Sequence, residues 1–176
     1  MIHIYTGNGK GKTTASLGVM IRTIGAGKKA AVIYFDKGGT HYSERAILDK
    51  LSIPYFAYGR DRIDPVTNRF DFSITDADRE MGEAGLQKAR ELVESREYQT
   101  IVLDEINSTA ALKMIDEEKV LELMTQIKKE SPDLEVIFTG RNATDQIKVM
   151  ADLVIEMKLE KHYFYNGVRA REGIDF

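Results

Sequence analysis

A short glycine-rich stretch near the N-terminus, residues 6–14, constrains the fold of this chain more than any other feature. It follows an apolar run at 2–5 and leads into a helical pattern that begins near Thr13. A strand, a glycine-rich loop and a helix in this order are typical of a phosphate-binding P-loop. Glycines let backbone N–H groups approach an anion, and the helix adds its positive N-terminal end. The stretch therefore predicts a nucleotide-phosphate site.

Side-chain chemistry assigns roles within this loop. Lys12 can place an ammonium group on phosphate oxygens, and Thr13 can offer its hydroxyl to Mg2+. The spacing departs from the usual Gly-x4-Gly-Lys-Ser/Thr pattern because Thr6 holds the first position, and Lys10 adds a second cation. The predicted phosphate-binding residues are Gly7, Asn8, Gly9, Lys10, Gly11, Lys12, Thr13 and Thr14.

Composition narrows the class of protein and its partners. The chain has 176 residues, 43% of them apolar, and a net charge of −3, so no overall positive charge draws it to nucleic acid or anionic membranes. Without cysteine, it has no disulfide or thiolate metal site, which fits a reducing compartment. It lacks a signal-peptide pattern and an apolar run long enough to span a bilayer. We therefore expect one cytoplasmic domain over residues 1–176.

Hydrophobic patterning predicts alternating strands and helices. Continuous apolar runs, which suit strands buried on both faces, predict strands at 2–5, 30–35, 53–57, 100–105, 134–139 and 153–157. Helical spacing and capping residues predict helices at 13–24, near 43–51, from 75 onward, from 116 to 131 and at 144–151. In the tail, Asn166-Gly167 between apolar residues indicates a hairpin. The pattern predicts a three-layer α/β fold with a mainly parallel sheet.

Two further candidates lie at the carboxyl ends of predicted strands, where such folds bind ligands. Four apolar residues followed by Asp104 and Glu105 match a Walker B strand, which places a carboxylate near the Mg2+ of the P-loop. Either acid could hold the metal, directly or through water. Arg141 follows another predicted strand and Gly140, so it can clamp a phosphate or a carboxylate.

These motifs together resemble the P-loop class of ATP:corrinoid adenosyltransferases, which act on cob(I)alamin or cob(I)yrinic acid a,c-diamide. The resemblance covers nearly the whole chain and implies the P-loop NTPase (RecA-like) fold. Besides the P-loop and Walker B segments, it rests on residues 139–141, 151–157, 161–164, 167–170 and 173–176. The tail is the more specific part, because generic P-loop ATPases have nothing like it.

The resemblance implies a reaction in adenosylcobalamin synthesis or salvage. Co(I) of the corrinoid attacks the 5′-carbon of ATP, which lies reversed along the loop, and triphosphate leaves with its charge held by Lys12, Lys10 and Mg2+. Glu105 joins them as a catalytic residue. On this hypothesis, Thr6 at the first position and the additional Lys10 adapt the loop to a leaving group that is the entire triphosphate. The family also implies a homodimer and a flavoprotein reductant.

One family feature differs in this chain. The family places a Phe-x-Trp pattern after the third strand, where aromatic residues under the corrin ring displace the lower axial ligand of cobalt. This chain has no tryptophan, and Phe70-Asp71-Phe72 is its nearest substitute. We therefore predict that Phe70 and Phe72 contact the corrinoid.

Two other functions use the same motifs. A P-loop ATPase or small-molecule kinase would also use Lys12, Thr13 and Asp104 or Glu105, but it would release ADP or orthophosphate. A non-catalytic sensor or carrier would bind ATP or corrinoid without forming product. Release of intact triphosphate distinguishes the adenosyltransferase from both.

Overall fold

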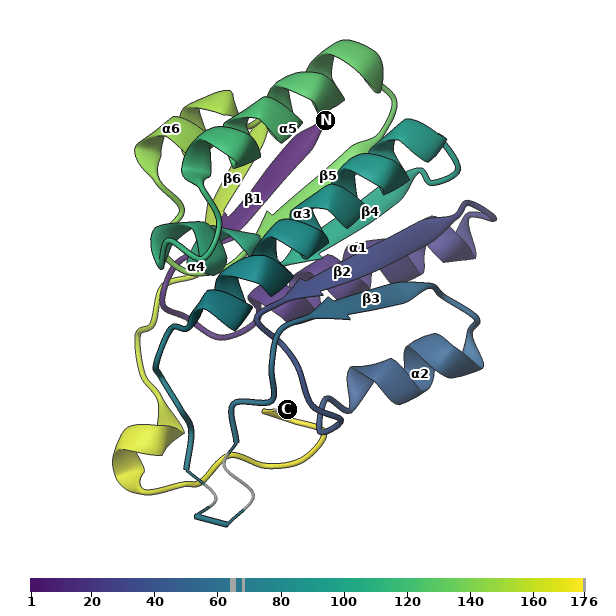
Figure 1. Ribbon diagram of the computed structural model, residues 1–176. Coiled ribbons are helices and arrows are strands. Elements are labelled where there is room, and N and C mark those ends of the chain that lie inside the picture. The colour runs from purple at the N-terminus through teal and green to yellow at the C-terminus, as the bar shows by residue number, and fades with distance from the viewer. Residues whose placement is uncertain (64–65, 68, 176) are drawn as a thin grey trace.

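The computed structural model describes residues 1–63, 66–67 and 69–175. Phe176, the last residue of the tail motif, lies outside them. Within the described residues, six parallel strands form one sheet in the order β3-β2-β4-β5-β1-β6 (Figure 1). The strands are β1 (Ile2–Thr6), β2 (Ala30–Phe35), β3 (Tyr55–Tyr58), β4 (Thr100–Asp104), β5 (Glu135–Thr139) and β6 (Leu153–Glu156). The predicted parallel sheet is confirmed.

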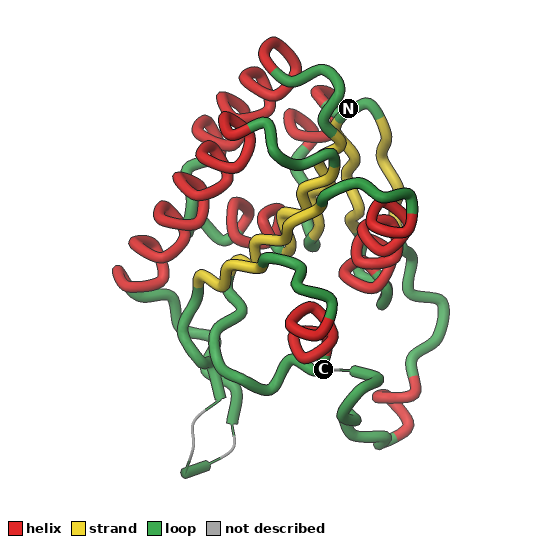
Figure 2. The backbone as a smooth tube through the Cα atoms, turned by 90° about the vertical axis from the view of Figure 1, so that its right-hand side faces the viewer, coloured by secondary structure: helices red, strands yellow, loops and turns green. Residues whose placement is uncertain are grey.

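Helices cover both faces of this sheet, and Figure 2 shows the twisted strands between them. The helices are α1 (Lys12–Gly25), α2 (Glu44–Lys50), α3 (Asp76–Ser95), α4 (Ile106–Ala111), α5 (Glu117–Glu130) and α6 (Asp145–Met150). Apolar residues of α1 and α2 pack on one face, and those of α3, α4, α5 and α6 pack on the other. This arrangement confirms the predicted three-layer α/β architecture.

Strand β5 lies between β1 and β4, so the P-loop strand and the Walker B strand are not neighbours. The register pairs Tyr5 with Thr139 and Leu103 with Phe138, which brings the carboxyl ends of these strands to one edge of the sheet. The predicted ligand loops after β1, β2, β4 and β5 therefore share that edge. This edge is where parallel α/β sheets bind ligands.

Two parts of the fold differ from the sequence-based expectation. The predicted hairpin at Asn166-Gly167 is wrong, because a 3-10 helix runs over Tyr163–Asn166 and Gly167 ends it with φ 81°. An Asn-Gly pair supplies the left-handed residue that a helix end uses as readily as one that a hairpin uses. Helix α4 was not predicted, since it is only six residues long and begins directly after the Walker B acids.

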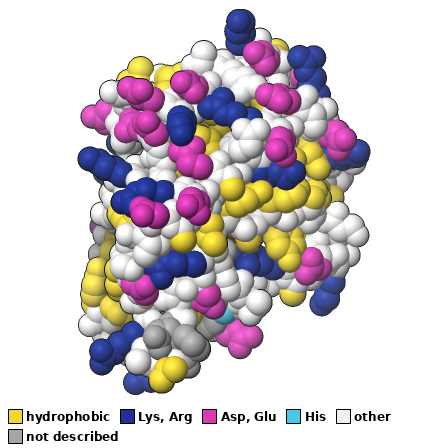
Figure 3. Space-filling view, in the orientation of Figure 1, with side chains coloured by type: hydrophobic (Ala, Val, Ile, Leu, Met, Phe, Trp, Pro, Cys, Tyr) yellow, Lys and Arg dark blue, Asp and Glu magenta, His cyan; other side chains and the backbone are white. Residues whose placement is uncertain are grey.

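Charged side chains of both signs are interspersed over the described residues on the face seen in Figure 3. This mixture agrees with the near-balance of charge in the sequence. Among the described residues, none of the helices is long and apolar enough to cross a membrane.

Candidate active site

The P-loop joins β1 to α1 and folds around the Lys12 side chain. Gly11 takes φ 110° at the start of α1, a left-handed conformation that glycine adopts without strain. The Lys12 ammonium donates to the carbonyl oxygens of Gly7 at 2.9 Å and Gly9 at 2.8 Å. Burial lowers the pKa of Lys12, and Arg141 acts in the same direction against the opposing charge of Glu105. The ammonium is thus held inside the loop on two neutral carbonyls, from which it can turn to a phosphate.

The chain that follows β6 leaves no room for a side chain at the first two glycines of the loop, Gly7 and Gly9. A side chain at Gly7 would place its Cβ 2.5 Å from the Met157 carbonyl oxygen, and one at Gly9 would place it 2.7 Å from the same atom. The Gly9 N–H donates to that oxygen at 2.7 Å. The backbone of Met157 therefore packs against one side of the P-loop.

The Walker B acids occupy different environments. Asp104 is fully buried, and its Oδ1 accepts a hydrogen bond from the Thr139 hydroxyl at 2.6 Å. Glu105 has φ 65° and begins α4, and its carboxylate accepts from the Ser108 hydroxyl at 2.5 Å. This left-handed backbone turns the chain so that Glu105 faces the ligand edge, whereas Asp104 stays in the core.

Lys37 joins the P-loop to the Walker B strand, and sequence reasoning missed it. Its ammonium donates to Asp104 Oδ2 at 2.5 Å and to the Thr13 hydroxyl at 3.2 Å. Burial alone would lower the pKa of Lys37, but the charges of Asp104 and Glu105 outweigh it and raise the pKa above its ordinary range. A signal was present, because Lys37 follows a buried strand at the same sheet edge as the P-loop.

The Thr13 hydroxyl and the Asp104 carboxylate together could hold a divalent cation. A hydroxyl and a carboxylate are the oxygen ligands that Mg2+ prefers, and the Lys37 ammonium shows that a positive charge is accommodated between them. Glu105 lies 3.9 Å from the same ammonium. The described residues contain no cluster of three or more acidic or histidine side chains, so any metal here would take its other ligands from phosphate or water.

An open pocket of about 1140 Å³ lies over this edge. The P-loop from Asn8 to Thr14 lines it together with Lys37, Glu105 and Arg141, whereas Gly7 and Asp104 do not reach its surface. The tail after β6 supplies the facing wall, including Tyr163. The pocket thus brings most of the predicted phosphate-binding residues together with a C-terminal aromatic segment.

Lys10 points to the tail. Its ammonium donates to the Tyr163 hydroxyl at 2.9 Å and to the Ile174 carbonyl oxygen at 2.5 Å, and it pairs with the Asp175 carboxylate. These contacts raise the pKa of Lys10, first through the hydrogen bond that the ammonium donates to Asp175 and second through the one that it donates to Tyr163. The extra cation of the loop therefore fastens the C-terminal wall of the pocket in this structure.

Phe70 and Phe72 lie on the long loop after β3 and are not among the residues that line this pocket. Their ring centroids are 4.7 Å apart, and the side chains are 50% and 83% exposed. The structure therefore pairs these two predicted residues with each other, with free faces toward solvent, and does not bring them beside the P-loop.

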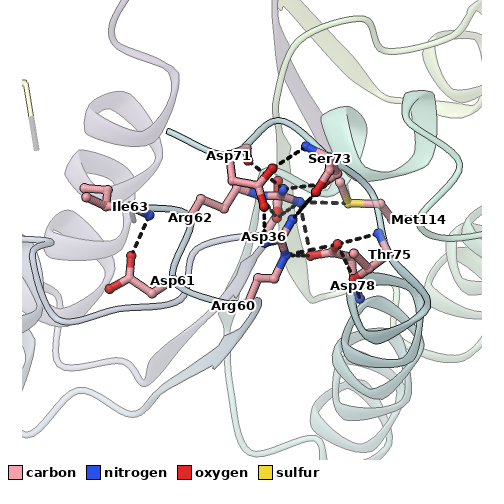
Figure 4. Close-up of polar contacts among 10 residues, drawn as sticks. All are labelled: Asp36, Arg60, Asp61, Arg62, Ile63, Asp71, Ser73, Thr75, Asp78 and Met114. Atoms are coloured by element: carbon pink, nitrogen blue, oxygen red, sulfur yellow. Dashed lines mark hydrogen bonds and ion pairs between the residues drawn. The ribbon is translucent and has the colours of Figure 1, made fainter. Parts of the chain in front are cut away.

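A partly buried charge network connects both ends of this loop (Figure 4). Arg62 pairs with Asp36 at 2.6 Å and with Asp78 at 3.2 Å, and Arg60 pairs with Asp78 at 2.9 Å and with Asp71 at 2.5 Å. Asp78 also closes a capping box with Thr75 at the start of α3. The network connects the loop that carries the aromatic pair to β2 and α3.

Comparisons with known proteins show the family of this chain. The family model described as "ATP:corrinoid adenosyltransferase BtuR/CobO/CobP" matches residues 1–176. The chain is 35% identical to a corrinoid adenosyltransferase of Sinorhizobium sp over 182 residues, covering 100% of this chain and 80% of the relative. It is 33% identical to a corrinoid adenosyltransferase of Escherichia coli strain K12 over 176 residues, covering 100% of this chain and 85% of the relative.

A solved structure shares the fold at low identity. The KaiC-like protein PH0186 of Pyrococcus horikoshii OT3 has a TM-score of 0.56 and 16% identity, with 92% of this chain and 73% of that chain covered. This likeness agrees with the predicted P-loop NTPase (RecA-like) fold. The family match over residues 1–176 shows that the chain belongs to the ATP:corrinoid adenosyltransferase family.

Proposed function

We propose that residues 1–176 form a single catalytic domain that transfers the 5′-deoxyadenosyl group of ATP to the Co(I) centre of a corrinoid and releases triphosphate. The observation that carries this proposal is the pocket that the P-loop, Glu105 and Arg141 share with the family-specific tail. A P-loop alone fits any nucleotide enzyme, whereas the tail wall is the part that resembles this family.

The chemistry depends on position and charge, with no proton to remove. Co(I) supplies the electron pair of the new cobalt–carbon bond and becomes Co(III), the bond between C5′ and its oxygen breaks, and triphosphate leaves with that electron pair. Negative charge grows on the leaving oxygen, so cations and N–H donors aimed at the phosphates lower the barrier. Loop glycines and the α1 N-terminus provide such donors.

Lys12 and Arg141 are the proposed protein cations for this charge. A donor that strengthens only in the transition state contributes about 3 kcal/mol. Mg2+ bound to Thr13 and Asp104, with Glu105 in reach, would neutralise further negative charge on the triphosphate. On binding ATP, the Lys12 ammonium would exchange the carbonyl oxygens of Gly7 and Gly9 for a phosphate oxygen.

The reaction is tested under anaerobic conditions with chemically reduced cob(I)alamin, ATP and Mg2+. We expect the Co(I) absorbance to disappear as adenosylcobalamin forms, at a rate that depends on ATP. Tight binding of both substrates without product would instead support a carrier or sensor.

Lys10 has two candidate partners, the triphosphate and the tail. If it serves the triphosphate during turnover, we expect Lys10→Ala to weaken ATP binding about tenfold, the size of one charge-assisted hydrogen bond. Isothermal titration with ATP measures this change, and steady-state kinetics measure turnover. Asp175→Asn is the matched control, because it loosens the tail but keeps the Lys10 ammonium. Unchanged ATP affinity and turnover in Lys10→Ala would contradict the triphosphate role.

Phe70 and Phe72 are proposed to pack against the lower face of the corrinoid, where their exposed rings would favour loss of the axial ligand before reduction of Co(II). We expect the double variant Phe70→Ala, Phe72→Ala to slow adenosylation by up to about tenfold when the assay starts from cob(II)alamin and a reductant, since a lost aromatic contact amounts to about 0.5–1.5 kcal/mol. The same variant should keep its rate with preformed cob(I)alamin. Equal slowing in both assays would rule out a role in reduction.

Three further properties belong to this proposal. A flavoprotein is the proposed source of electrons for Co(I), and the cytoplasm, where ATP and reductants are supplied, is the proposed location. A homodimer is proposed as the assembly. It is supported by β6 at the edge of the sheet, where Leu153, Val154 and Ile155 are each about 40% exposed. An exposed apolar edge strand favours association.

A further inference from the structure

Lys37 places a positive charge where the two proposed metal ligands meet. Its side chain is 14% exposed, and it bridges the buried Asp104 carboxylate and the Thr13 hydroxyl. These two groups come from segments 91 residues apart in the sequence, since 104 − 13 = 91. The ammonium thus links the P-loop to the Walker B strand.

We propose that the Lys37 ammonium occupies the divalent-cation position in the nucleotide-free protein and leaves it when metal-bound ATP arrives. This inference rests on the proposed function, because it takes Thr13 and Asp104 as the protein partners of the metal. The inference adds Lys37 to that site, and it makes the binding of the metal depend on the nucleotide.

The two cations exclude each other for a geometric reason. Asp104 Oδ1 accepts from Thr139, so Oδ2 is the oxygen that remains for a cation, and Lys37 binds it at 2.5 Å. Mg2+ binds carboxylate oxygen at about 2.0–2.1 Å. An ammonium and a divalent ion on one oxygen would lie within about 4 Å of each other and repel strongly. Only one of them occupies this position at a time.

The pocket offers the displaced ammonium a new partner. Lys37 lines the same pocket as Lys12 and Arg141, where the triphosphate is proposed to lie. Its flexible stem and three N–H donors allow it to turn from a carboxylate to a phosphate oxygen. Without ATP, the pocket holds no such anion, so Lys37 remains on Asp104 and a free divalent ion is kept out. Lys37 then becomes an additional ligand of the leaving triphosphate.

The test is a titration of nucleotide-free protein with Mn2+, followed by electron paramagnetic resonance of the free ion. We expect Lys37→Met to bind Mn2+ at least about tenfold more tightly than the wild type, because the competing charge is gone. Lys37→Arg keeps the charge and should bind as weakly as the wild type. Adding Thr13→Val to Lys37→Met should abolish the gained binding. Equal Mn2+ affinities of wild type and Lys37→Met would overturn the proposal.

A second measurement uses the wild type, in case Lys37→Met does not fold. The 15N signal of the Lys37 ammonium, assigned by its absence in Lys37→Arg, is expected to shift when Mg2+ and ATP are added together. An unchanged signal would overturn the displacement.

Two results distinguish an error in the assignment of Thr13 and Asp104 as metal ligands from an error in the proposed displacement of Lys37. If Thr13→Val leaves Mn2+-ATP affinity unchanged, the metal assignment of the proposed function fails, and this inference fails with it. If Thr13→Val weakens Mn2+-ATP binding while the Lys37 signal stays in place, the metal assignment stands and only the displacement is overturned.

Discussion

Replacing Lys12 with alanine is expected to lower the rate of adenosyl transfer by about 10²–10³-fold, the usual cost of losing one donor that acts on transition-state charge. The reason is the position of its ammonium, which lies inside the P-loop on two carbonyl oxygens and lines the pocket. Charge on the triphosphate grows as the C5′–O bond breaks, so the loss should appear mainly in kcat and less in KM for ATP. Anaerobic stopped-flow kinetics with cob(I)alamin measure both.

Lys10→Ala removes the other cation of the same loop for comparison, and its effect on kcat should be smaller than that of Lys12→Ala because the Lys10 ammonium pairs with the Asp175 carboxylate of the tail. Thermal unfolding without ATP shows whether Lys12→Ala disturbs the loop by freeing the Gly7 and Gly9 carbonyls. A Lys12→Ala rate close to that of the wild type would exclude this residue from leaving-group stabilisation.

Replacing Arg62 with methionine is expected to produce the largest loss of stability, about 3–5 kcal/mol, because it takes the ion-pair partner from Asp36 and one of two arginine partners from the buried Asp78. Arg62 is 5% exposed and Asp78 is 3% exposed. The guanidinium also donates to the carbonyl oxygens of Asp71 at 3.1 Å and Ser73 at 2.8 Å. A chain of this size should lose about 10 °C in melting temperature, which differential scanning calorimetry detects.

Arg79→Met is the control for this prediction. Arg79 pairs with Asp76 at 2.8 Å, but the two side chains are 51% and 96% exposed, so the expected loss is below about 1 kcal/mol. If Arg62→Met destabilises the protein no more than Arg79→Met does, the partly buried charge network of Figure 4 does not hold the loop after β3.

Acid should weaken the same network. Burial alone would raise the pKa of Asp78, but hydrogen bonds from Thr75 and Arg60 and the charge of Arg62 outweigh it and hold that pKa below its ordinary value. A carboxyl group with a depressed folded-state pKa stabilises the fold above its unfolded-state pKa of about 4. This contribution is lost as the pH falls through the lower folded-state pKa.

The parts of the fold that were predictable from the sequence depend on local signals. Buried parallel strands need apolar residues on both faces, so the runs at 30–35 and 100–105 were recognisable without any partner. The P-loop was recognisable because the residues that bind phosphate, its glycines with Lys12 and Thr13, all lie within nine consecutive positions. The Walker B acids could be expected near them because all strands end at one edge.

The remaining features depend on contacts between distant segments. Lys37 meets Thr13 and Asp104 only because β2 lies beside β4, and no spacing in the sequence encodes that contact. The Lys10 contact with the tail joins residues 165 positions apart. The tail itself was misread as a hairpin because Asn166-Gly167 favours two kinds of turn. Phe70 and Phe72 could be named from the sequence, but their place outside the pocket required the structure.

The most direct test of adenosyl transfer follows the phosphorus of ATP. Wild-type protein, cob(I)alamin, ATP and Mg2+ are incubated without oxygen, and the products are identified by 31P NMR while adenosylated corrinoid is quantified in the same sample. We expect intact triphosphate in an amount equal to the adenosylated corrinoid. ADP and orthophosphate in its place, with the corrinoid unmodified, would contradict the assignment and identify a P-loop enzyme that cleaves at the γ-phosphate.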